Sequence, residues 1–185
     1  MARVHIPDIP GEMPTRYVYG ELAPKIGAAA AGYSVAVYEH SLLSPREMEG
    51  ARYRTAQING CTLCAEHRAY LYDTHLPGSP TPLERPMHSR GEIPQEDFYD
   101  AVAGWRTSAM FSERERLAIE FAERMGLEPQ SFQGDEAFWA RLHAHYTDRE
   151  IVDLTLSVAS WVAAGRVTHI LELDAHCHLP GALAA

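Results

Sequence analysis

The chain has 185 residues, of which 46% are hydrophobic and 22% charged, a balance that suits one folded domain and excludes disorder throughout. Its 25 acidic residues outnumber its 16 lysines and arginines, and the net charge of −9 argues against nucleic acid or an anionic membrane as a partner. No run of 18 apolar residues is present, and the first eight residues lack the apolar core of a signal peptide. We therefore expect a cytoplasmic protein.

The first third of the chain is predicted to form an arm followed by two helices. Residues 1–23 show little periodicity, which indicates an extended N-terminal arm, and residues 24–42 are alanine-rich and suit a helix. Residues 44–47, Ser-Pro-Arg-Glu, supply an N-cap, a proline at the first helical position and a glutamate at the third. That helix is expected to end at Asn59-Gly60, because both residues tolerate left-handed geometry.

The rest of the chain is also predicted to be helical. Cys61 to about Thr74 suits a further helix, and the Pro-, Gly- and Ser-rich residues 76–94 are expected to form a long loop. Capping residues and helical spacing predict four more helices, over about residues 95–105, 112–125, 136–145 and 151–173. No segment alternates as a strand would, so the fold class is all-α: a single domain over residues 1–185 with about seven helices.

The sharpest feature of the sequence is Cys61-Thr-Leu-Cys64. Two cysteines three residues apart at a helix start can close a disulfide, and the amide dipoles of a helix N-terminus lower the pKa of a thiol beside them. A thiolate in that position is a nucleophile, and its neighbour can resolve the oxidised product. Acidity at the helix start favours Cys61 as the attacking residue and proximity to His67 favours Cys64, so both assignments stay open.

Three residues are candidates for handling protons or charge near the cysteines. On a continuing helix His67 and Arg68 would lie about 60° to one side of Cys64 and about 40° to the other. Glu49 precedes Cys61 by twelve residues, about 18 Å along a straight helix, which is too far to act. If the chain turns back at Asn59-Gly60, Glu49 faces the cysteines and could accept a thiol proton.

The run from Ser44 through Glu49 and Asn59-Gly60 to Cys61-Thr-Leu-Cys64 resembles the carboxymuconolactone decarboxylase and alkylhydroperoxidase D-like family. The segments that begin at Phe111-Ser-Glu-Arg-Glu and Tyr146-Thr-Asp-Arg-Glu are similar to the two later helix starts of that family. The resemblance covers roughly residues 20–174.

The resemblance implies an all-α homo-oligomer (dimer, trimer or hexamer) that reduces hydroperoxides and is restored by an external dithiol of protein or lipoyl type. It implies Cys61 and Cys64 as the redox pair and Glu49 as the proton-relay glutamate, with no cofactor and no metal. The peroxidase members carry histidine four residues after the second cysteine, where this chain has Arg68, and His67 is one residue earlier. An arginine cannot deprotonate a thiol, but it can stabilise a thiolate.

Three alternative functions are compatible with the same residues. The chain could be a lactone decarboxylase, a redox-sensing oligomer without turnover, or a zinc-binding protein. Zinc needs four ligands, and the tail His176-Cys177-His178 would have to join Cys61 and Cys64. We expect Cys177 to be non-catalytic. The other tryptophans and histidines that could belong to a site are expected to pack in the core or at subunit contacts instead. They are Trp105, Trp139, Trp161, His143, His145 and His169.

Overall fold

The computed structural model describes residues 2–8, 12–77, 79 and 81–173. Its α-helices are α1 (Pro14–Tyr17), α2 (Pro24–His40), α3 (Pro45–Asn59), α4 (Thr62–Glu66), α5 (Glu96–Ala101), α6 (Glu113–Leu127), α7 (Glu136–His145) and α8 (Asp148–Ile170). A π-helical turn covers Val18–Leu22, and 3-10 turns cover Ala69–Leu71, Met87–Arg90, Val102–Gly104 and Pro129–Phe132. The described part of the chain contains no strand, only an isolated bridge between His75 and Pro82. The predicted all-α fold class is confirmed.

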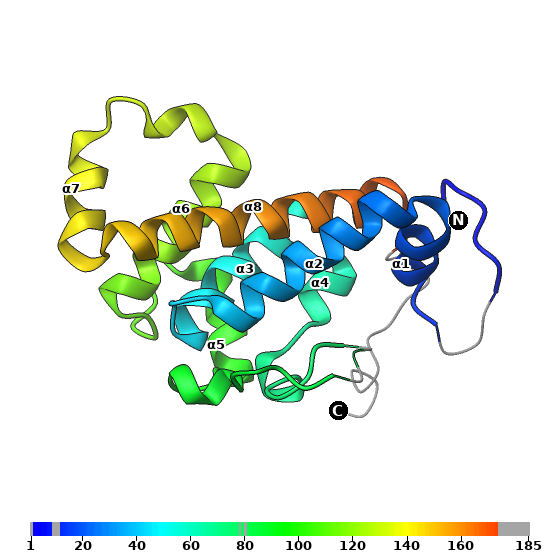
Figure 1. The fold of residues 1–185 in the computed structure, drawn as a ribbon. Coiled ribbons are helices and arrows are strands. Elements are labelled where there is room, and N and C mark those ends of the chain that lie inside the picture. The colour runs from blue at the N-terminus through cyan, green and yellow to red at the C-terminus, as the bar shows by residue number, and fades with distance from the viewer. Residues whose placement is uncertain (1, 9–11, 78, 80, 174–185) are drawn as a thin grey trace.

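Helices α3, α6 and α8 form the centre of the fold. Figure 1 shows α8 running alongside α2 and α3, with α1 near one of its ends and α7 near the other. The main core gathers apolar side chains from these helices, among them Met48, Leu117, Phe121, Leu142, Leu154, Val158 and Trp161. A smaller core lies under α5 and consists of Phe98, Tyr99, Val102, Trp105, Phe111 and Ile119.

The structure confirms the helix starts that were predicted from capping residues. Ser44, Ser112 and Thr147 each accept a hydrogen bond from the backbone N–H three residues later, and the glutamate there accepts one from the backbone N–H of the cap residue. Such reciprocal caps satisfy backbone donors that a helix leaves unpaired. Asp135 caps α7 without a reciprocal bond, by accepting from the N–H of Phe138.

Arginines join the three capping boxes to one another. Arg46 donates to Glu115 at 2.5 Å, and Arg114 in return donates to Glu47. Arg114 also reaches Glu150 at 2.8 Å, so one guanidinium links the first turns of α3, α6 and α8. Glu47 and Glu115 are buried, while their arginines stay partly open to solvent, at 20% for Arg46 and 34% for Arg114. The main effect of these pairs is to fix how the three helix ends meet.

Two sequence predictions are wrong in detail. The arm over residues 1–23 is not extended throughout, because α1 and the π-helical turn cover Pro14–Leu22. The helix predicted from Cys61 to about Thr74 stops at Glu66. Arg52 explains why the helix stops there. Its guanidinium donates to the carbonyls of Cys64 at 2.6 Å and His67 at 2.9 Å, and so replaces the backbone N–H groups that a further helical turn would supply.

By length and composition alone, α8 could cross a membrane, with a mean hydropathy of 1.2 over its most apolar 18 residues. The central helix of a soluble protein passes the same test. Here α8 buries Leu154, Val158 and Trp161 in the main core. Packing within the fold therefore accounts for part of its apolar character, since 44% of that window is buried.

Candidate functional site

The turn that presents the cysteines is built from Asn59 and Gly60. Gly60 adopts φ 65°, a left-handed conformation in which a side chain would be strained, and its N–H closes α3 on the carbonyls of Ala56 and Gln57. The Asn59 side chain donates to the carbonyl of Trp161 at 3.1 Å. Its amide fits there because α8 has Gly165 at the contact, where a Cβ would come within 2.4 Å of Asn59 Nδ2.

Cys61 and Cys64 are joined in a disulfide, with Cα atoms 5.3 Å apart. Cys61 is the N-cap residue of α4, and its Sγ accepts the N–H of Cys64 at 3.2 Å. The two sulfurs differ in access: Cys61 is 1% exposed and lies in a small cluster with Leu63 and Tyr72, whereas Cys64 is partly exposed. Since α4 has only five residues, its dipole is a weak argument for Cys61 as the more acidic thiol.

Glu49 lies fully buried at the centre of a hydrogen-bond network. Arg52 donates to both of its oxygens, from Nε and from Nη2, each at 2.8 Å, and the Tyr99 hydroxyl donates to Oε2 at 2.8 Å. Burial alone would raise the pKa of Glu49, but the charge and hydrogen bonds of Arg52 lower it below its usual value. Glu49 is therefore a carboxylate, and Arg52 links it to the backbone of the cysteine helix through Cys64 and His67.

His67 is buried behind α4, with its ring stacked on Tyr72 at 5.0 Å and tilted against Tyr38 at 5.8 Å. Burial lowers the pKa of His67 to about 3, and the nearby Arg52 charge acts in the same direction. The imidazole is therefore neutral near pH 7. Its Nε2 atom is buried and has no hydrogen-bond partner among the residues that the structure describes.

Arg68 points into a different network. It donates to both carboxylate oxygens of Glu96 at 2.7 Å, and its guanidinium lies 4.5 Å from the Tyr99 ring centroid. It also donates to the carbonyl of Ala65, one of the carbonyls at the end of α4. Because the helix ends at Glu66, the angles expected for a continuing helix do not apply to His67 or Arg68.

Cys64 opens into a cavity of about 620 Å³ between α2, α3, α4 and α8. That volume lies in the range of small-molecule sites. Most of the lining is apolar or small, including Met13, Ala31, Val35, Ala56, Leu63 and Ala164. Neither Cys61 nor Arg68 lines it. The polar and charged side chains of the lining are Glu12, Thr15, Arg16, Tyr19, Ser34, Tyr38, Arg52, His67, Ser79 and Trp161.

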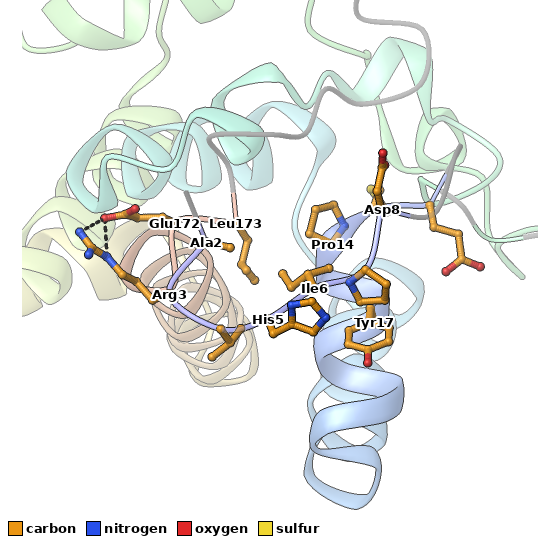
Figure 2. A pocket seen from close by; sticks show the side chains of 13 residues that line it. Ala2, Arg3, His5, Ile6, Asp8, Pro14, Tyr17, Glu172 and Leu173 are labelled. Carbon is orange, nitrogen blue, oxygen red and sulfur yellow. Dashed lines mark hydrogen bonds and ion pairs between the residues drawn. The ribbon is translucent and has the colours of Figure 1, made fainter.

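A second cavity of about 620 Å³ lies between the N-terminal arm and the end of α8. Figure 2 shows His5, Ile6 and Tyr17 around it, and Arg3 bonded to Glu172 at its edge. Neither of the two cysteines within the described residues lines it. Chemistry that needs a sulfur therefore belongs to the cavity beside Cys64.

Four residues of the site gave no functional signal in the sequence. Arg52 and Tyr99 hold Glu49, and Tyr38 and Trp161 line the cavity beside Cys64. Trp161 was predicted to be a core residue, which it is, but its indole also faces the cavity. Only the three-residue spacing from Glu49 to Arg52 could have suggested an ion pair.

The zinc ligands considered from the sequence do not come together within the described residues. There, no group of three or more His, Cys, Asp or Glu side chains could hold a metal ion. Cys61 and Cys64 are bonded to each other, and a disulfide is not the thiolate that zinc binds. His176, Cys177 and His178 lie outside the described residues.

No family model matches the chain. The uncharacterized protein YnjA of Escherichia coli K12 is 34% identical over 82 residues, which are 43% of this chain and 44% of YnjA. The match therefore spans less than half the length of that relative. Among solved structures, ATU0492 of Agrobacterium tumefaciens superimposes with a TM-score of 0.66 over 86% of this chain and 94% of its own, at 20% identity. ATU0492 is described as a protein of unknown function, with a suggested role in antioxidant defence as AhpD. At that identity the likeness shows the fold, and the chain therefore has an AhpD-like all-α fold.

Proposed function

We propose that the chain is a thiol-dependent antioxidant oxidoreductase of the carboxymuconolactone decarboxylase and alkylhydroperoxidase D-like family, which reduces organic hydroperoxides. One observation carries the proposal: the Cys61–Cys64 pair has one sulfur buried and the other facing a mostly apolar cavity of about 620 Å³. The antioxidant role suggested for the structural neighbour agrees with it.

Access decides which cysteine attacks. Cys64 lines the cavity and Cys61 does not, so a substrate in the cavity reaches Cys64 first. A buried thiol one helical turn away is suited to resolving the product, because it meets Cys64 without meeting the substrate. We therefore assign Cys64 as the attacking residue and Cys61 as the resolving residue.

The cycle has three steps. The Cys64 thiolate attacks the terminal oxygen of the hydroperoxide, so that an S–O bond forms, the O–O bond breaks and the alkoxide leaves as an alcohol once protonated. Cys61 then attacks the sulfenic sulfur, forming the disulfide and releasing water. An external dithiol, of protein or lipoyl type, reduces the disulfide and becomes oxidised itself.

In this proposal Glu49 and Arg52 set the charge around the cysteines, and His67 or a water passes protons. Arg52 binds the carbonyl of Cys64 and is itself neutralised by Glu49, which keeps a buried cation next to the thiolate at tolerable cost. Neutral His67 can accept or donate a hydrogen bond without bringing a second cation into the site. Arg68 has no step here, since it pairs with Glu96.

We also propose a homo-oligomer in the cytoplasm. The grooved surface between α2 and α8 exposes Leu42, Val152 and Leu156, at 53, 58 and 52%. Apolar side chains gathered on one face are typical of surfaces that a partner covers. Light scattering on the full chain would give the number of subunits.

The test is a thiol count on reduced protein before and after one equivalent of cumene hydroperoxide. We expect the three thiols of the chain to fall to one, with Cys61 and Cys64 linked in the mass spectrum. Cys64→Ser should consume no hydroperoxide. Cys61→Ser should react once and hold a sulfenic acid on Cys64 that dimedone traps.

Cys177→Ser is the matched control, and its hydroperoxide consumption should equal that of the wild type. If all three thiols of the wild type survive, the proposed peroxidase activity is contradicted, and a protein without turnover or a lactone decarboxylase is favoured. Disulfide formation that no dithiol reverses would instead favour a sensor that acts once.

A further inference from the structure

The lining of the cavity beside Cys64 includes two residues with a buried polar atom that has no normal hydrogen bond to any of the described residues. The indole N–H of Trp161 and Nε2 of His67 are buried without a hydrogen-bond partner, and each residue is 8% exposed. The Tyr38 hydroxyl lies close enough to receive a weak interaction from the Trp161 indole N–H, but the contact does not have the geometry of a normal hydrogen bond. Since a buried polar group is normally hydrogen-bonded and is costly to leave unpaired, both groups point to a ligand that pairs them.

The chemistry of these two groups is complementary to a hydroperoxide. An indole N–H only donates, so it needs an oxygen lone pair. Nε2 of a neutral imidazole with its proton on Nδ1 only accepts, so it needs an O–H. An R–O–O–H group offers both, because the oxygen bonded to carbon accepts and the terminal oxygen carries a proton.

We infer that Trp161 and His67 are the groups that bind the peroxide: the Trp161 indole N–H donates to the oxygen attached to carbon, and His67 Nε2 accepts the terminal O–H. The inference rests on the proposed function, and it adds to it a residue of α8 that holds the leaving oxygen. The organic part of the substrate occupies the apolar remainder of the cavity, among side chains such as Val35, Leu63 and Ala164.

Trp161 then does more than hold the substrate. As Cys64 attacks the terminal oxygen, the O–O bond breaks and negative charge develops on the oxygen attached to carbon. A fixed N–H aimed at that oxygen in a water-poor cavity stabilises the charge more in the transition state than in the bound hydroperoxide. Loss of this donor should therefore slow the reaction with peroxide and leave other reactions of the same thiolate unchanged.

Trp161→Phe removes the N–H and keeps an aromatic ring. We expect its single-turnover rate with cumene hydroperoxide to fall roughly 10- to 100-fold. The rate of its Cys64 with an aromatic disulfide reagent should change by less than about twofold, because no alkoxide leaves in that reaction. The matched control is Trp139→Phe, whose indole N–H already donates to the carbonyl of Phe132 at 3.0 Å, and it should leave both rates unchanged.

Equal losses with both reagents, or no loss with either, would overturn the inference. A wild type that does not react with hydroperoxide would overturn the proposed function, so a second measurement tests Trp161 without turnover. Cumyl alcohol, the product of cumene hydroperoxide, is titrated into the oxidised protein while the indole N–H signals of its three tryptophans are followed by NMR. We expect the signal missing from Trp161→Phe to shift and those of Trp105 and Trp139 to stay. No shift at Trp161, or equal shifts at all three, would overturn the assignment of the donor.

Discussion

Arginine and glutamate act in opposite ways at two places in this fold. Where α3, α6 and α8 begin, the glutamates close capping boxes and the arginines join one box to the next, at sites partly open to water. At the end of α4, Arg52 is buried against Glu49, and its remaining N–H groups take the carbonyls of Cys64 and His67. The first arrangement starts helices, and the second ends one.

The difference is one of burial. At the helix starts the arginines remain in contact with water, so an arginine that loses its glutamate there is still solvated. A fully buried pair is stable only while both partners are present, since either one alone is a charge without solvent. The fold should therefore tolerate the loss of a glutamate charge at a helix start better than the loss of the Glu49 charge beside the cysteine helix.

The largest effect is expected for Glu49→Gln. It leaves the guanidinium of Arg52, which is 4% exposed, without its counter-charge, and should cost about 3–5 kcal/mol in the free energy of unfolding. Urea denaturation followed by circular dichroism would measure it. The control is Glu113→Gln, which removes an exposed partner of Arg141 and should cost less than about 1 kcal/mol. Similar losses in the two variants would contradict the contrast.

Removing both charges sharpens the same comparison. In Glu49→Gln combined with Arg52→Met no buried charge is left, so the double variant should be more stable than Glu49→Gln alone. The carbonyls of Cys64 and His67 would lose their donor, however, so full recovery is not expected. A double variant less stable than the single would mean that those carbonyl bonds, and not the charge, dominate.

The part of the pH dependence of stability that comes from His67 should be the next largest effect. The unfolded chain binds a proton at this residue below about pH 6.5, whereas burial and the charges of Arg52 and Arg68, opposed by Glu49, delay protonation of the folded protein to about pH 3. Stability should therefore fall as the pH drops from 6.5 toward 3, by at most about 1.4 kcal/mol per pH unit. His67→Gln should flatten that dependence, measured by urea denaturation at a series of pH values. The exposed His40→Gln is the control and should keep the wild-type slope.

These two regions also differ in how far sequence could predict them. Ser112 and Glu115 lie three residues apart, so their capping box is visible in the sequence and the structure has it. The end of α4 depends on Arg52, twelve residues before Cys64 and on another helix, and no local pattern shows that contact. Glu49 was found through a family resemblance. Trp161 was placed in the core by its spacing, which carries no information about an unpaired N–H.

A smaller effect is expected at the helix starts. Ser112→Ala removes one side-chain acceptor of a capping box and should cost about 1 kcal/mol in the free energy of unfolding. Thr107→Ala, which lies outside any helix start, should be close to neutral in the same urea experiment. A loss at Ser112 as large as that of Glu49→Gln would show that the linked boxes act as one cooperative unit.

The smallest effect is expected for Arg68→Met, and it bears most directly on function. Arg68 occupies the position where the peroxidase family has histidine, so a role as thiolate partner predicts a large loss of hydroperoxide reduction. The structure instead pairs Arg68 with Glu96, stacks it on Tyr99 and leaves it out of the cavity lining. Methionine keeps much of the side-chain volume, so we expect the rate with cumene hydroperoxide to change less than about fivefold, the size of an exposed ion-pair effect. A loss of two orders of magnitude or more would make Arg68 the thiolate partner, and His67 would then be a packing residue behind the cysteine helix.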